Sequence, residues 1–128
     1  DLDDADVAAI YKAGCRLGIS THAWYEIARA HYFKPSYIAI GPIFATTTKE
    51  MPFDPQGLKQ LQMWQDFIGE HYPTVAIGGI NKTNAADVLA TGVGSIAMVR
   101  PITEAKDQAA AINELNTIIK NYGSTPND

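Results

Sequence analysis

Short apolar runs alternate with helical patterns along most of this chain, and that alternation constrains the fold more than any other feature. Residues 17–19, 37–40, 74–77 and 95–99 each read as a short strand. Strand runs that are apolar on both faces and separated by helices indicate a parallel sheet. We therefore predict an α/β protein built from parallel βα repeats, with about four strands and five helices.

Helix start and stop signals fall in the intervals between these runs. Residues 4–13 form a first amphipathic stretch, and residues 112–119 carry a last apolar stripe. Side chains that cap helix starts, a proline at a first helical position and glycines at helix ends mark the boundaries. The predicted starts are Ser20 or Thr21, Asp54 followed by Pro55, and Thr83, and the predicted stops include Gly14 and Gly92.

The length and composition fit one domain. We assign residues 1–122 to a single domain and residues 123–128 to a flexible tail. The 128 residues hold 10 basic and 14 acidic side chains, a net charge of −4, so there is no basic footprint for nucleic acid. No apolar run is long enough for a membrane span, and the single Cys15, read as a small core residue, excludes an internal disulfide. We expect a cytoplasmic protein with small-molecule ligands.

A hydroxyl-rich loop follows the second strand. Thr46, Thr47, Thr48 and Lys49 come shortly after the apolar residues 37–40. In a parallel βα protein the carboxyl ends of the strands are where ligands bind. Hydroxyl donors with one ammonium suit a phosphate or diphosphate. A plain polar loop rich in threonine is the alternative interpretation.

Four motifs in chain order resemble those of the thiamine-phosphate synthase family. They are Leu17-Gly18-Ile19-Ser20-Thr21-His22, Gly41-Pro42-Ile43-Phe44 with Thr46, Thr48 and Lys49, Pro55-Gln56-Gly57-Leu58, and Ala76-Ile77-Gly78-Gly79-Ile80. The resemblance implies a (β/α)8 TIM barrel and a transferase that joins a pyrimidine-methyl diphosphate to a thiazole phosphate. It covers only the C-terminal half of that barrel, so we expect an isolated half-barrel that is inactive alone.

The resemblance also implies a role for each matched residue. Lys49 would be the catalytic cation at the departing diphosphate, and Ser20 would donate a hydrogen bond to the same group. The thiazole phosphate would be held by Thr46, Thr47, Thr48, Gly79, Val99 and Arg100.

Arg100 departs from the family pattern, which commonly has serine there. It is expected either to bind the phosphate or to pair with an acid such as Glu104. The intact family uses Mg²⁺, and the resemblance places one of its ligands at Asp1. Whether this chain binds the metal on its own is left open.

Other polar and aromatic residues receive structural interpretations. His22 lies near the mouth of the expected site and is assigned a helix-start or structural role. Trp24 and Trp64 sit at helical spacing and are assigned to packing.

Two other functions remain open. A related thiazole tautomerase has the same fold, but that family typically has histidine where this chain has Pro42. A non-catalytic phosphate-binding half-barrel that forms a homo-oligomer through its open sheet edges is the second alternative.

Overall fold

The computed structural model describes residues 2–48 and 52–123 as four parallel strands with helices between them. The strands lie in the order β1-β2-β3-β4, with Ile19 beside Ile38, Ala39 beside Val75 and Ala76 beside Ile96. This confirms the predicted parallel α/β sheet. The elements are α1 (Val7–Lys12), β1 (Gly18–Thr21), α2 (Trp24–Phe33), β2 (Tyr37–Ile40), α3 (Gly57–Ile68), β3 (Thr74–Ile77), α4 (Ala85–Ala90), β4 (Ser95–Ala97), α5 (Arg100–Thr103) and α6 (Gln108–Gly123).

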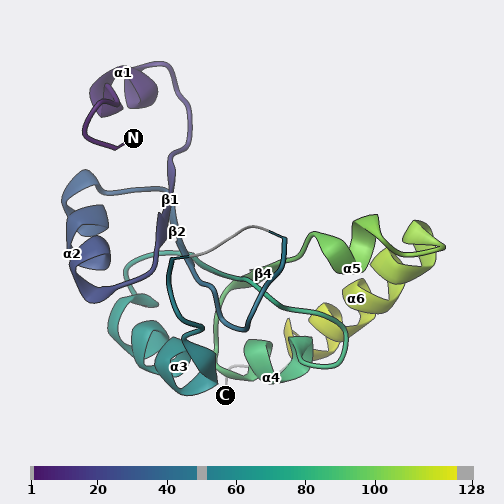
Figure 1. Ribbon diagram of the computed structural model, residues 1–128. Helices are drawn as coiled ribbons and strands as arrows, with labels where there is room; N and C mark the ends of the chain where they lie inside the picture. The colour runs from purple at the N-terminus through teal and green to yellow at the C-terminus, as the bar shows by residue number, and fades with distance from the viewer. Residues whose placement is uncertain (1, 49–51, 124–128) are drawn as a thin grey trace.

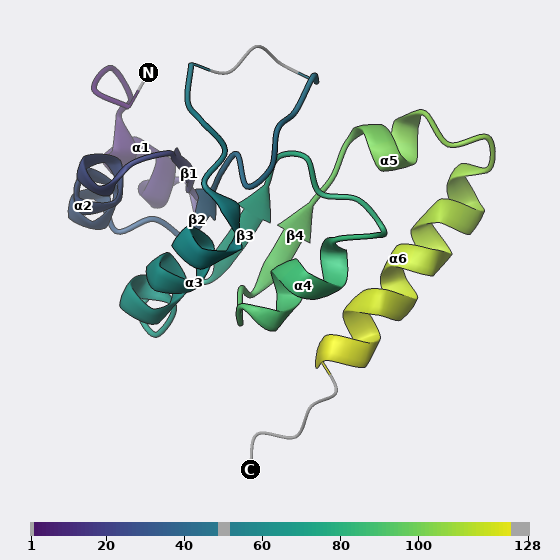
Figure 2. The ribbon, with the colours of Figure 1, turned by 60° about the horizontal axis from the view of Figure 1, so that its bottom comes forward.

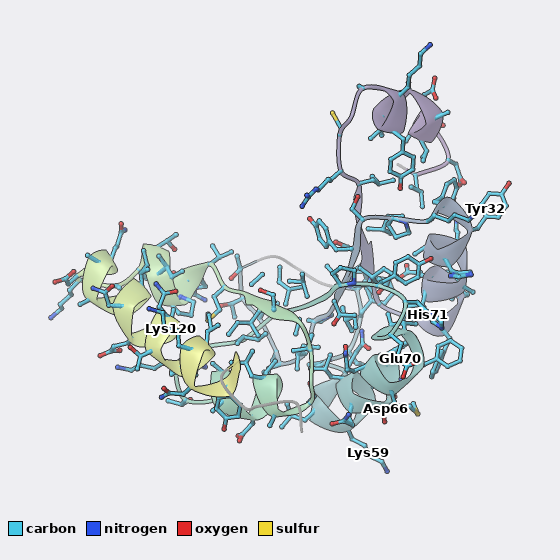
Figure 3. All side chains as sticks on the ribbon, turned by 180° about the vertical axis from the view of Figure 1, so that it is seen from behind. Tyr32, Lys59, Asp66, Glu70, His71 and Lys120 are labelled. Atoms are coloured by element: carbon cyan, nitrogen blue, oxygen red, sulfur yellow. The ribbon has the colours of Figure 1, made fainter. Side chains whose placement is uncertain are left out.

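The helices cover one face of the sheet. In Figure 1, α2, α3, α4 and α6 form an arc around the strands, while α1 extends beyond β1. Ile38 and Ile40 of β2 are buried against this layer, as are Leu61 and Trp64 of α3. Figure 3 shows the outward side of α2 and α3, from which Tyr32, Lys59 and Asp66 project. The main core therefore lies between the sheet and its helices.

Within the described residues, the other face of the sheet is open. Alternate strand residues point to it, and Ser20, Tyr37, Ile77 and Ser95 are all exposed. Tyr37 is 41% and Ile77 39% accessible, although both lie within strands. The strand runs that read as apolar on both faces are therefore buried on one face only.

Several predicted boundaries were wrong. Ser20 and Thr21 belong to β1 rather than capping the next helix, which begins at Trp24. The Thr21 hydroxyl donates to the Ala39 carbonyl of the neighbouring strand at 3.0 Å, so it links two strands of the sheet. The third helix begins at Gly57, later than the Asp54-Pro55 signal predicted.

The remaining corrections concern the second half of the chain and Cys15. Helix α4 begins at Ala85 rather than directly after Thr83. A short helix, α5, was not predicted, and it raises the number of helices in the described residues to six. Cys15 is exposed instead of lying in the core. None of the helices in the described part of the chain has the length and apolar character needed to cross a membrane.

Candidate functional site

The connections that follow the four strands meet at one end of the sheet. Figure 2 shows the β2–α3 connection and α5 on the same side of the strands. A cavity of about 1110 Å³ lies there, against the open face of the sheet. Its lining includes residues predicted for the site from all four strand ends: Ser20, Thr46, Thr48, Gly79, Val99 and Arg100.

Of the predicted site residues that the structure describes, Thr47 is not on the cavity wall. Thr47 is exposed, and its Oγ1 accepts a hydrogen bond from Nη1 of Arg100 instead. Lys49 and Asp1 lie outside the described residues. The structure thus brings together described site residues from all four strand ends, while the positions of the predicted catalytic cation and metal ligand stay predictions.

The hydroxyl-rich loop is fixed where it leaves β2. The backbone N–H of Ile43 donates to the Ile77 carbonyl at 3.0 Å, and that of Phe44 donates to the Gly78 carbonyl at 3.0 Å. Farther along, the N–H of Thr48 donates to Oγ1 of Thr46 at 3.2 Å. These bonds join the loop to the β3–α4 turn and curl it so that Thr46 and Thr48 face the cavity.

Gly79 is needed in the β3–α4 turn for two reasons. Its φ is +64°, a conformation that residues with a side chain rarely adopt. A Cβ at this position would also lie 2.5 Å from the Ala45 carbonyl oxygen and 2.7 Å from Cβ of Phe44. The turn and the β2–α3 connection therefore approach each other more closely than any side chain at position 79 would allow.

Arg100 stands at the opposite side of the cavity from β1. Its Nε donates to Oε1 of Glu104 at 2.7 Å, and its Nη1 donates to Thr47. The hydrogen bond and the charge of Glu104 raise the pKa of the guanidinium further above its ordinary value. Both sequence interpretations of Arg100 remain compatible with this arrangement, because the side chain lines the cavity while it is paired with Glu104.

The sequence interpretation missed a cluster around His22, which also lines the cavity. Its ring Nδ1 lies 3.0 Å from Oε2 of Glu26, and its ring stacks on Phe53 with 4.4 Å between centroids. The i,i+4 spacing of His22 and Glu26 was a usable signal for the pair. Nothing in the sequence pairs His22 with Phe53, which is 31 positions away.

The predicted use of Mg²⁺ stays a prediction. Among them, no group of three or more His, Cys, Asp or Glu side chains is placed to hold a metal ion. Mg²⁺ is held by carboxylate and other oxygen ligands. Glu104 is the one carboxylate among the described cavity-lining residues, and it is already bonded to Arg100.

Parallel βα units with helices outside and polar connections at the carboxyl ends of the strands define the class of parallel α/β proteins, to which the (β/α) barrels belong. A family model described as thiamine monophosphate synthase matches residues 1–102. The chain therefore belongs to the thiamine monophosphate synthase family.

Individual relatives agree with this assignment. The chain is 53% identical over 120 residues to a thiamine-phosphate synthase of Serratia proteamaculans, and 54% identical over 120 residues to one of Pectobacterium atrosepticum. Each match covers 94% of this chain but 56% of the relative, so the chain spans about half the length of these curated relatives. A solved thiamine phosphate pyrophosphorylase from Pyrococcus furiosus superposes with a TM-score of 0.80 at 31% identity, over 94% of this chain and 57% of that chain.

Proposed function

We propose that this chain forms the C-terminal half of a (β/α)8 barrel in a thiamine-biosynthetic transferase. The reaction would couple 4-amino-2-methyl-5-(diphosphooxymethyl)pyrimidine with thiazole phosphate to give thiamine phosphate and diphosphate. The observation that carries the proposal is the convergence of Ser20, Thr48, Gly79 and Arg100 on one cavity. Membership of the family supports the choice of chemistry.

The thiazole phosphate would lie between the β2–α3 connection and the start of α5. Thr46 and Thr48 supply hydroxyl donors, with the backbone of Thr47 between them. Gly79 offers a backbone N–H that a ligand can approach closely because there is no side chain. Val99 and Arg100 would complete this subsite, and a guanidinium is suited to forked contacts with phosphate oxygens.

The diphosphate would lie nearer β1. As the pyrimidine CH2–O bond breaks, negative charge grows on the leaving oxygens, and a fixed cation there stabilises the transition state more than the ground state. Lys49 would be that cation, since it directly follows Thr48, and Ser20 would donate to the same group. The thiazole nitrogen is already nucleophilic, so no general base is required. Mg²⁺ would need oxygen ligands from outside the described residues, and no step here passes through it.

The open sheet face supports a further part of the proposal, namely that the chain acts as part of a larger assembly. Tyr37 and Ile77 leave apolar surface uncovered, and β1 and β4 have unpaired edges within the described residues. Such edges and patches favour pairing with another sheet. The partner would be the rest of a barrel or a second copy of this chain, in a cytoplasmic setting. Light scattering of the isolated chain that shows only monomer would argue against association between copies.

Reconstitution tests the central proposal. The 128-residue chain would be joined to the part of the Serratia proteamaculans relative that the match leaves uncovered, and thiamine phosphate formation would be measured. We expect turnover from the fusion and none from the isolated chain. A folded fusion without turnover, beside an active full-length relative, would refute the proposed reaction. Turnover by the chain alone would refute its inactivity.

A further inference from the structure

The return arm of the β2–α3 connection, residues 52–56, is held by contacts that the proposed reaction does not use. The outgoing arm is bonded to the β3–α4 turn, where the N–H of Phe44 donates to Gly78. The return arm and the helix start are bonded to the outgoing arm, because the N–H groups of Gln56 and Gly57 donate to the carbonyls of Pro42 and Ile43 at 2.9 Å. The return arm also meets the turn after β1. There the side chains of Phe53 and Gln56 both contact His22. The two arms of one loop are therefore bonded to each other, and each also contacts a different neighbour.

Glu26 fixes His22 at two points. Its Oε2 accepts a hydrogen bond from the backbone N–H of His22 at 2.5 Å and lies 3.0 Å from the ring Nδ1. The two side chains are 22% and 24% exposed, so the pair is largely shielded. A carboxylate bonded to one ring nitrogen sets the orientation of an imidazole. The plane of the His22 ring is thus set by α2, on which Glu26 lies.

The return arm rests on this fixed ring. The rings of Phe53 and His22 are stacked, with an interplanar angle of 7°. The Nε2 of Gln56 donates to the carbonyls of His22 at 3.2 Å and Gly41 at 2.9 Å. The Oε1 of the same amide is buried with no hydrogen-bond partner among the described residues. An unpaired buried acceptor has a free-energy cost, so Gln56 holds the two turns together at some expense to stability.

We propose that His22 is a positioning residue for the β2–α3 connection. Its ring, oriented by Glu26, supports Phe53 on the return arm, which is bonded to Pro42 and Ile43 of the outgoing arm. Through these bonds His22 helps to set where Thr46 and Thr48 lie on the cavity wall. The inference rests on the proposed function, because it assigns to His22 the geometry of the thiazole phosphate subsite rather than any contact with the reacting atoms.

A double-mutant cycle in the reconstituted enzyme tests this role. The variants are His22→Ala, Phe53→Ala, the double variant and His22→Phe, with His31→Ala as a matched control. His31 lies on α2, and its Nδ1 bonds to the hydroxyl of Tyr72. We expect each single alanine variant to raise KM for thiazole phosphate about tenfold, the upper range for one stacked ring pair, with little change in kcat.

The cycle separates positioning from direct contact. If the two rings act as one unit, the double variant is no worse than either single variant. His22→Phe keeps a flat ring against Phe53 and should restore KM to within about threefold of the parent value. An additive double variant, with KM raised about a hundredfold, would overturn the proposal. So would a His22→Phe variant as impaired as His22→Ala.

Hydrogen exchange of the 128-residue chain gives a readout that does not depend on turnover. His22→Ala and Phe53→Ala should speed exchange of the amides at residues 44–48 to the same extent, while His31→Ala leaves them unchanged. Unchanged exchange in the first two variants would refute positioning even if the fusion is active. Faster exchange beside an inactive parent fusion would uphold positioning and refute only the reaction.

Discussion

Replacing Gly79 by alanine tests whether the close approach of the β3–α4 turn to the β2–α3 connection shapes the cavity. Two costs should add. A φ of +64° strains any residue with a side chain, by about 1 to 2 kcal/mol. The new methyl group would also overlap the Ala45 carbonyl oxygen, at 2.5 Å, and the Cβ of Phe44, at 2.7 Å. Overpacking of this kind costs about 1 to 3 kcal/mol.

Gly92 offers a control in which only the first cost applies. Its φ is +81°, but the nearest atom to an added Cβ is Cγ of Gln65 at an ordinary 3.7 Å. Gly92→Ala should therefore lower the free energy of unfolding by about 1 to 2 kcal/mol. Gly79→Ala should lower it by about 2 to 5 kcal/mol, the sum of strain and overlap.

Urea unfolding, followed by the fluorescence of Trp24 and Trp64, measures the difference between the two variants. A gap of about 2 kcal/mol corresponds to a shift of about 1 M in the midpoint. In the reconstituted enzyme, Gly79→Ala should also raise KM for thiazole phosphate, because the overlap pushes the Thr46 loop outward. Equal destabilisation by Gly79→Ala and Gly92→Ala would show that the β2–α3 connection moves away from the new methyl group without cost. The steric argument would then be refuted.

Three further predictions concern the ion pair of Arg100, the hydrophobic core and the predicted cation at the leaving group. Glu104→Gln should lower KM for thiazole phosphate by up to about fivefold, because it frees Arg100 from an exposed ion pair; a raised KM would contradict this. Leu61→Ala should lower the free energy of unfolding by about 2 to 5 kcal/mol, whereas the exposed Met63→Ala should change it by less than about 1 kcal/mol in the same urea titration. Lys49→Ala should lower kcat sharply, and steady-state kinetics that show an effect on KM alone would exclude a role at the leaving group.

The sheet was predictable because apolar runs between helices have few alternatives. Residues 37–40 and 74–77 were assigned to strands from their sequence, and β2 and β3 have these bounds. Element boundaries were not predictable where the residue at the boundary can form either of two kinds of hydrogen bond. A threonine hydroxyl can cap a helix or bond across a sheet, and the sequence does not show that Thr21 reaches Ala39. Helix α5 has too few residues to show an apolar period.

The start of α3 shows how contacts distant in sequence override a local signal. Asp54 and Pro55 have the residue types of a helix start, yet the helix begins at Gly57. The chain before it contacts the turn after β1, where Phe53 stacks on His22, and Gln56 bonds the carbonyls of His22 and Gly41. Local propensity predicts an earlier start, and tertiary contacts decide against it.

The sequence predicted that the site residues lie close together, but it did not predict their detailed contacts. Parallel strands bring their carboxyl ends to one edge, so any polar residues that follow them must gather there. Correct strand assignments were enough to predict that Ser20, Thr48 and Gly79 lie close together. Which groups then bond to each other depends on side-chain reach. Arg100 is four residues from Glu104 and 53 residues from Thr47, yet it bonds to both.

The pairing of Arg100 has a consequence for how the cavity would accept an anion. Its two partners lie on different elements, so the guanidinium links α5, which carries Glu104 at its end, to the β2–α3 connection. An arriving phosphate would offer a charged acceptor in place of the neutral Thr47 hydroxyl, and bonds to charged acceptors are about twice as strong. Exchange of Thr47 for phosphate would release the loop from α5. The bonds of Ile43 and Phe44 to the β3–α4 turn, together with the support that His22 gives to the return arm, would then keep Thr46 and Thr48 facing the ligand.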